Sequence, residues 1–159
     1  MIKKQCLKFK QKFKINKKIF IDRGASKFSH CQIINHSELK KYLNKKNFRI
    51  VHLASHSFAK QIYMFWNANC IIGAHGEALT NLVFSKPKTK VIELKPFGHR
   101  VKNYQRISKV NNLHFSSIES QKKYLKNKHK DIFVNFKKID RKIKIKYIIL
   151  HFCILQFYF

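Results

Sequence analysis

A short glycine-containing turn between two apolar segments contains the residues of this sequence best suited to ligand chemistry. The apolar run Ile71-Ile72 stops at Gly73, the chain turns through Ala74-His75-Gly76, and apolar residues return with helical spacing from Leu79. Because glycine has no Cβ, the backbone can approach a ligand closely there. The first N–H groups of a helix carry partial positive charge and suit a phosphate. The pattern predicts an anion-binding loop, and glycines that serve only to form the corner are the simple alternative.

Strands and helices alternate along the chain on both sides of this turn. Short β-favouring runs alternate with segments whose apolar residues have helical spacing. The predicted strands are 18–22, 48–53, 69–72, 89–94, a short one at 113–115, and a fifth main strand at 131–134. The predicted helices are 35–46, 58–66, 79–83, 104–110 and a last one from about Lys137. This order predicts an α/β fold, a Rossmann-like parallel sheet with helices on both faces, with ligands bound at the carboxyl ends of its strands.

One of the predicted helices is rich in aromatic residues. Phe58, Phe65 and Trp66 recur at the spacing of a buried helix face. They are therefore predicted to belong to the core and not to a platform on which a sugar could stack.

Length and composition predict one globular domain with an extreme positive charge. The chain has 159 residues, 45% of them hydrophobic, and a formal net charge of +28. The two ends of the chain have the strongest excess of basic over acidic residues. This distribution predicts a basic N-terminal extension at 1–17, a Rossmann-like lobe at 18–146 and an apolar C-terminal segment at 147–159. Such a charge favours polyanions such as nucleic acid, anionic lipid and phosphorylated ligands without selecting one of them. The abundance of lysine, asparagine, isoleucine and phenylalanine is also typical of an AT-rich genome, so codon bias is an alternative explanation.

The spacing of the cysteines and the composition of the terminal segments indicate the cellular compartment of the protein. The four cysteines form no CxxC pair and predict neither a zinc site nor a disulfide framework; they are Cys6, Cys31, Cys70 and Cys153. Free thiols and the lack of a signal-peptide pattern predict a reducing, cytoplasmic location. The segment 147–159 is shorter than the roughly 20 residues of a membrane-spanning helix. It is expected to be a core element or, with the lysines before it, an interfacial anchor at a membrane surface.

Several motifs occur together in the order and spacing of one family. They are Ile19-Phe-Ile-Asp-Arg23, Ile34-Asn35 with Glu38-Leu39, Phe48-Arg-Ile-Val51, Ser57-Phe-Ala-Lys-Gln61, Ile72-Gly-Ala-His-Gly76 with Leu79-Thr-Asn81, and Val91-Ile-Glu-Leu94 with Pro96. The sequence resembles the glycosyltransferase 61 family, which includes extracellular O-linked N-acetylglucosamine transferases and plant xylan xylosyl- and arabinosyltransferases. The resemblance extends over about 18–120 and, more faintly, 131–141.

The resemblance implies a GT-B architecture, in which two Rossmann-like lobes enclose the active site. It implies inverting transfer of a sugar from a nucleotide diphosphate, with a UDP-sugar as the expected donor and a glycan or protein as the acceptor. The chain is similar to the C-terminal, donor-binding lobe alone. The N-terminal lobe, which in the family supplies acceptor contacts and the catalytic base, has no counterpart in 1–17, so we expect either a separate chain that supplies it or a truncated gene product.

The resemblance also implies roles for single residues. Arg23 and His75 are the expected catalytic residues: the guanidinium would hold the diphosphate, and the imidazole would donate to a phosphate or sugar oxygen or carry a proton. A solvated arginine and a merely hydrogen-bonding histidine are the alternatives. Glu93 would bind ribose hydroxyls, with a salt bridge to a lysine as its competitor. The other expected substrate contacts are Gly73, Gly76, Ala78, Leu79, Thr80 and Asn81, of which Asn81 can equally tie its helix to a neighbouring loop.

The sequence departs from the family pattern near the expected site. Ala74 replaces a proline, Glu77-Ala78 stands where the family has small residues, and Lys27 and Gln32 lie where further arginines are usual. A carboxylate at this position would repel a bound phosphate, so weakened or altered donor binding is expected. No metal-ligand spacing and no Asp-x-Asp motif is present, so no metal cofactor is predicted. An inactive fragment and a basic module that binds a membrane surface or nucleic acid, without a specific nucleic-acid partner, are the competing hypotheses.

Overall fold

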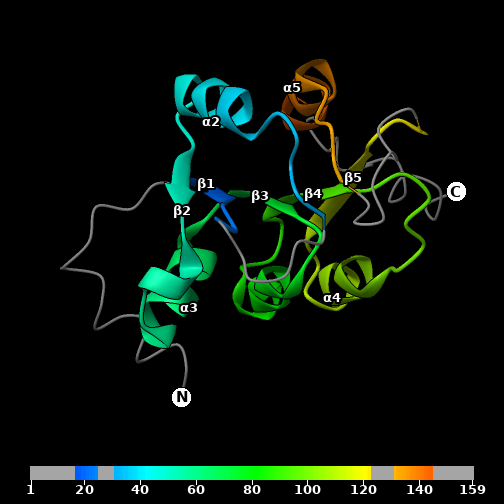
Figure 1. Cartoon of the computed structure of the whole chain (residues 1–159). Coiled ribbons are helices and arrows are strands. Elements are labelled where there is room, and N and C mark those ends of the chain that lie inside the picture. Colours follow the sequence, from blue (N-terminus) through cyan, green and yellow to red (C-terminus); the bar gives the residue numbers. More distant parts are fainter. Residues whose placement is uncertain (1–16, 25–30, 123–130, 145–159) are drawn as a thin grey trace, which may run out of the picture.

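Five parallel strands form the centre of the molecule in Figure 1, a computed structural model that describes residues 17–24, 31–122 and 131–144. The strand order is β2-β1-β3-β4-β5. The strands are β1 (Lys18–Ile21), β2 (Arg49–Val51), β3 (Cys70–Ala74), β4 (Lys90–Lys95) and β5 (His114–Glu119). The helical elements are α2 (His36–Lys45), α3 (Phe58–Asn67), α4 (Asn103–Val110), α5 (Phe136–Lys144) and the two 3-10 segments η1 (Leu53–Ser55) and η2 (Glu77–Phe84). The predicted Rossmann-like α/β sheet is confirmed.

Helices cover both faces of the sheet because its strands are apolar on both faces. On β1, Phe20 packs into the core beneath α2 and α5, whereas Ile19 and Ile21 pack into the core formed with α3, η2 and α4. On β3, Ile72 and Ile71 divide between the same two cores. Figure 1 shows α2 and α5 on one side of the strands and α3 and α4 on the other. A continuous apolar strand therefore requires both helical layers.

The prediction of a strand at 131–134 is wrong. Ile132 makes a single parallel bridge with Ile33, outside the sheet, and β5 is formed instead by His114–Glu119, which extends the short strand predicted at 113–115. Next to the bridge, the Asn35 side chain accepts from the Val134 N–H at 3.0 Å and donates to the Val134 carbonyl at 2.9 Å. The burial of Ile132 and Val134 thus comes from packing over α2 and α5 and not from strand pairing.

The helix after the glycine turn is a 3-10 helix, Glu77–Phe84. Three residues per turn place Leu79 and Leu82 on one side, and both are fully buried. Val83, the last residue of the helix predicted at 79–83, is 46% exposed.

The aromatic residues of α3 do not all belong to the core as predicted. Phe65 is fully buried, but Phe58 is 61% exposed and meets Phe84 edge to face, with ring centroids 5.6 Å apart. Trp66 is half-buried, and the Lys86 ammonium lies 5.3 Å from its ring centroid. Phe58 is the first residue of α3, where helical spacing does not ensure burial.

Part of the terminal and cysteine predictions lies outside the described residues, namely 147–159, nearly all of 1–17, Cys6 and Cys153. Cys31 and Cys70 are free thiols, and burial raises the pKa of Cys70 to about 11. Within the described ranges, no helix combines the length and apolar character needed to cross a bilayer.

Candidate functional site

A crevice opens where the strand order changes direction. The chain passes from β1 outward to β2 through α2, then back across β1 to β3 through α3, so the connections leave β1 and β3 on opposite faces of the sheet. Sheets with this order bind ligands outside the carboxyl ends of these two strands. The crevice measures about 700 Å³. It is lined by Ile21, Asp22, Arg23, Cys31, His52, Leu53, Ala54, His75, Gly76, Glu77 and Ala78.

Strand register places Arg23 and His75 at the same level of the crevice. Ile21 pairs with Gly73 in the β1–β3 ladder, and Arg23 and His75 each follow two residues later. Arg23 Nη1 donates to the His75 carbonyl at 3.1 Å. A Cβ on Gly76 would lie 3.1 Å from the Arg23 guanidinium carbon, so the missing side chain at Gly76 lets the guanidinium pack on the turn. The structure therefore brings together the two parts of the site that the sequence predicted separately.

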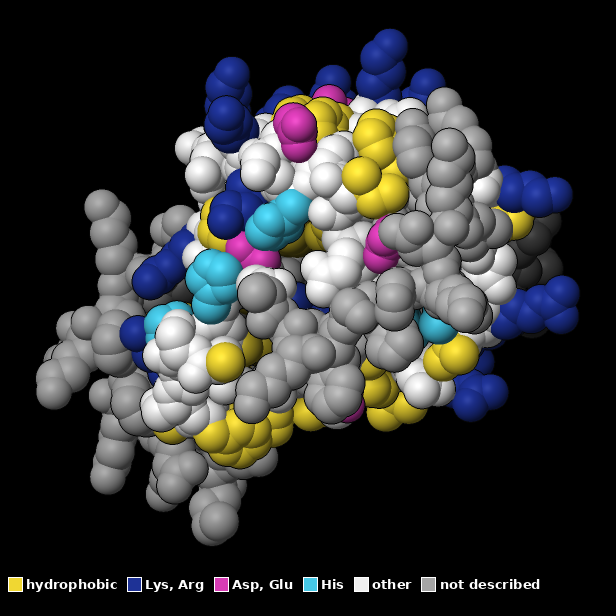
Figure 2. Space-filling view, in the orientation of Figure 1, with side chains coloured by type: hydrophobic (Ala, Val, Ile, Leu, Met, Phe, Trp, Pro, Cys, Tyr) yellow, Lys and Arg dark blue, Asp and Glu magenta, His cyan; other side chains and the backbone are white. Residues whose placement is uncertain are grey.

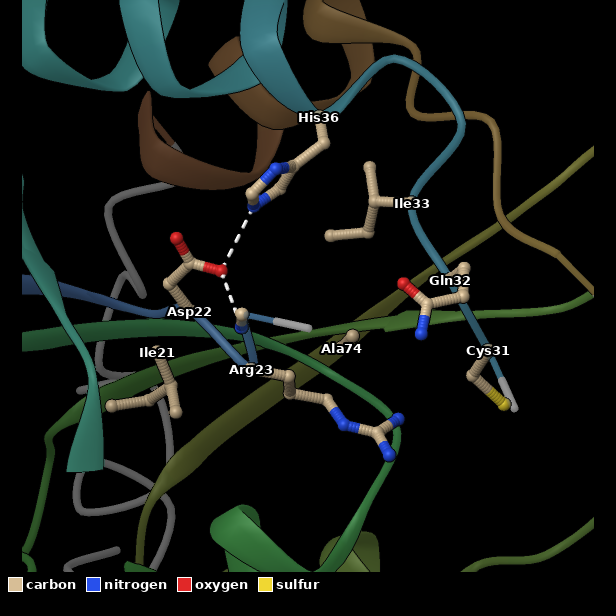
Figure 3. A pocket seen from close by; sticks show the side chains of 9 residues that line it. Ile21, Asp22, Arg23, Cys31, Gln32, Ile33, His36 and Ala74 are labelled. Atoms are coloured by element: carbon tan, nitrogen blue, oxygen red, sulfur yellow. Dashed lines mark hydrogen bonds and ion pairs between the residues drawn. The ribbon is translucent and has the colours of Figure 1, made fainter. Parts of the chain in front are cut away.

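Asp22 is a buried carboxylate that fixes the loop carrying Arg23, and no role for it was predicted from the sequence. Its Oδ1 accepts from the Gly24 N–H at 2.9 Å and pairs with His36 Nε2 at 2.8 Å. Its Oδ2 lies 3.4 Å from Lys40 Nζ and 3.5 Å from His52 Nε2. Figure 3 shows His36 facing Asp22 from above, whereas Arg23 extends away from both. The Asp22 side chain thus closes a turn that directs Arg23 toward the His75–Gly76 corner.

The electrostatics keep Asp22 ionised. Burial by itself would raise the pKa of its carboxyl group, but the Gly24 hydrogen bond and the imidazoles of His36 and His52 outweigh burial, and the pKa is lowered. A smaller cavity of about 70 Å³ lies beside Asp22, between β1 and the residues that lead into α2. In the sequence, the available signals for Asp22 were its place in the Ile19-Phe-Ile-Asp-Arg23 motif and an acidic residue at the end of a predicted strand in a chain with 7 acidic residues.

His75 is held on the β4 side of the crevice. Its Nδ1 lies 2.5 Å from Glu93 Oε1, and the two side chains are 15% and 5% exposed. The rings of His99 and Tyr104 pack against the imidazole, with centroids 3.9 and 5.1 Å away. Burial and, less strongly, the charge of Glu93 raise the pKa of Tyr104. The partner found for Glu93 among the described residues is thus His75 and not a lysine.

The remaining predicted contacts divide between packing and the crevice wall. Gly73 is buried, and a Cβ there would lie 2.9 Å from Leu79 Cδ2, so this glycine allows η2 to pack on β3. The Leu79 N–H donates to the Gly76 carbonyl at 3.0 Å and is therefore not available to a ligand. Ala78 lines the crevice.

Thr80 and Asn81 are engaged in contacts between elements. The Thr80 side chain lies near the Tyr104 hydroxyl and lowers its pKa, against the stronger effect of burial, and Asn81 Nδ2 donates to Gln61 Oε1 of α3 at 3.0 Å. Neither residue lines the crevice. For Asn81, the structure matches the alternative in which the side chain ties η2 to a neighbouring element.

Charged side chains at the crevice have both signs. Glu77 is exposed and lines the crevice, opposing the charge of Arg23. Figure 2 shows histidine and acidic side chains meeting on the face turned to the viewer, below the lysines that project over α2. Within the part of the chain that is described, no group of three or more histidine, cysteine, aspartate or glutamate residues could hold a metal ion.

The strand order and the crevice at its switch point define the chain as a doubly wound parallel α/β protein. Within this class, the match to Glycosyltransferase 61 covers residues 2–92, more than half of the chain, and the chain belongs to this glycosyltransferase family. The match includes Arg23 and the His75–Gly76 turn and ends one residue before Glu93. No curated protein matches the chain.

Proposed function

We propose that the crevice binds the diphosphate of a nucleotide-diphosphate sugar, with a UDP-sugar as the first candidate. In this proposal the chain acts as the donor-binding lobe of an inverting glycosyltransferase. Family membership supports the donor class. The observation that carries the site is the packing of the Arg23 guanidinium on Gly76 at the switch point between β1 and β3.

Arg23 and the start of η2 supply the chemistry that a departing nucleotide needs. A guanidinium can hold two phosphate oxygens, and the Ala78 N–H at the crevice wall can donate to a third. During transfer, an acceptor hydroxyl oxygen forms a bond to the sugar C1 and the bond from C1 to the diphosphate breaks, leaving its electron pair on the nucleotide. Arg23 offsets that charge, and the hydroxyl proton passes to a base on the acceptor side. Glu77 opposes the same charge, so the proposed affinity for the nucleotide is modest.

Calorimetry with UDP at physiological salt tests this assignment. Arg23→Ala removes a charge-assisted contact of about 1.5–3 kcal/mol, which corresponds to roughly 10- to 150-fold weaker binding. Arg49→Ala is the control for net charge, because Arg49 is exposed and begins β2 at the opposite end of the strands from the crevice. Equal losses in the two variants would mean that UDP responds only to overall charge, and the proposal would then be abandoned.

A further inference from the structure

The contact between His75 and Glu93 is more closely constrained than an incidental ion pair. The His75 N–H donates to the Leu94 carbonyl at 2.7 Å, its carbonyl accepts from Arg23 at 3.1 Å, and its Nδ1 pairs with Glu93 at 2.5 Å. His99 and Tyr104 pack against the ring. The backbone and the ring of His75 are thus held by neighbours on β4, on the loop after β1 and on the segment around α4.

The chemistry of the pair determines which ring nitrogen can meet a ligand. An ionised carboxylate only accepts hydrogen bonds, so the short contact requires the proton on Nδ1 of His75. Nε2 is then the ring nitrogen that remains for a ligand in the crevice that His75 lines. The Glu93 side chain, 5% exposed, supplies a buried counter-charge when the imidazole carries protons on both nitrogens.

We infer that Glu93 is a positioning residue that acts on the donor through His75. It fixes Nδ1–H on His75, so that Nε2–H of the imidazolium donates to a diphosphate oxygen beside Arg23. This inference rests on the proposed function and replaces the expected contact between Glu93 and ribose. The register supports it: Glu93 pairs with Gly73 on the adjoining strand, which places the carboxylate beside the base of the turn.

Two probes separate a diphosphate role from a ribose role. Calorimetry with UDP and with inorganic pyrophosphate is carried out on the wild type, Glu93→Gln, His75→Ala and the double variant. We expect Glu93→Gln to weaken both ligands by the same factor, about tenfold, because it turns a contact with a charged partner into a neutral one. In the His75→Ala background, Glu93→Gln should cause no further loss.

The tautomer of His75 gives a readout that a merely structural role would not change. Long-range 1H–15N spectra of the wild type should show the His75 ring protonated at Nδ1, with the assignment taken from His75→Ala. Glu93→Gln should lose this preference, since an amide can either donate or accept. Glu38→Gln, at an exposed position on α2, removes the same charge and should change neither the spectrum nor the affinity.

Each contrary result has a distinct meaning. If Glu93→Gln weakens UDP but not pyrophosphate, or still weakens UDP when His75 is absent, Glu93 contacts the ribose and the inference is wrong while donor binding stands. If affinity and tautomer are unchanged in Glu93→Gln or in the shorter Glu93→Asp, the pair has no positioning role. If the wild type binds neither probe, the proposed function itself fails.

Discussion

The buried carboxylate of Asp22 gives the most specific prediction about stability. Asp22→Asn keeps the size of the side chain and an oxygen that can accept from Gly24, but it removes the charge. Hydrogen bonds to charged groups contribute about 1.5–3 kcal/mol and neutral ones about 0.5–1.5 kcal/mol. For the contacts to Gly24 and His36, at 2.9 and 2.8 Å, the loss is therefore roughly 2–3 kcal/mol.

Two further cations add little to this loss. Lys40 and His52 lie 3.4 and 3.5 Å from Asp22 Oδ2, but their side chains are 36% and 51% exposed, so solvent screens them. Each contributes less than about 1 kcal/mol. We expect urea denaturation followed by circular dichroism at pH 7 to give Asp22→Asn a free energy of unfolding about 2–4 kcal/mol below that of the wild type.

The pH dependence of this difference has a definite sign. Because folding lowers the pKa of Asp22, the stabilisation is fully present above the ordinary value of 3.8 and is lost as the pH falls through the lower folded-state value. The advantage of the wild type over Asp22→Asn should therefore shrink below about pH 4. A difference that is as large at pH 3 as at pH 7 would refute the assignment of the stabilisation to the ionised carboxylate.

A matched control exists on the surface of α5. Asp140 pairs with Lys46 at 3.1 Å, but the two side chains are 36% and 43% exposed. Asp140→Asn removes the same charge and should cost less than about 1 kcal/mol. If both variants lose equal stability, the change in net charge and not the buried cluster is responsible.

Three further predictions concern the turn and its surroundings. Gly76→Ala places a Cβ 3.1 Å from the Arg23 guanidinium and should displace it, so that calorimetry shows about tenfold weaker UDP binding. In the Arg23→Ala background, the same substitution should have no further effect on UDP binding. Gly73→Ala places a Cβ 2.9 Å from the buried Leu79 and should lower the free energy of unfolding by about 1–3 kcal/mol in urea titrations. The Cys70 thiol, with its pKa raised to about 11, should resist iodoacetamide at pH 8 in the folded chain and react after unfolding, as peptide mass spectrometry would detect.

The strands of the sheet could be predicted because the sequence pattern that indicates each strand lies within the strand and its neighbouring segments. Apolar runs such as Ile71-Ile72 have strand length, are separated by segments with helical spacing, and need no distant partner to be recognised. The segment 131–134 has the same local pattern and was wrongly predicted to be a strand. Its environment is decided by Ile33 and Asn35, about 99 residues away in the sequence, and local spacing contains no such information.

The candidate site was predictable to the extent that parallel strands align their ends. Arg23 and His75 follow adjacent strands, so one register brings them together. The surroundings of Asp22 depend on where α2 and the residues after β2 pack, because His36 and His52 reach it from separate elements. That arrangement is a property of tertiary packing, and the sequence signal for it was a single acidic residue.

The charge of the chain and the charge of the crevice have different consequences for ligand binding. Lysines on the outer surfaces of α2 and α5 act through water and salt, where charges further apart than about 8 Å are largely screened at physiological ionic strength. Arg23 is half-buried at the crevice and backed by an ordered turn, so it can contact a diphosphate directly. The two buried carboxylates, Asp22 and Glu93, each pair with a histidine at this edge of the sheet. A net charge of +28 attracts any anion, so selectivity for the proposed diphosphate has to come from the local geometry that these carboxylates hold.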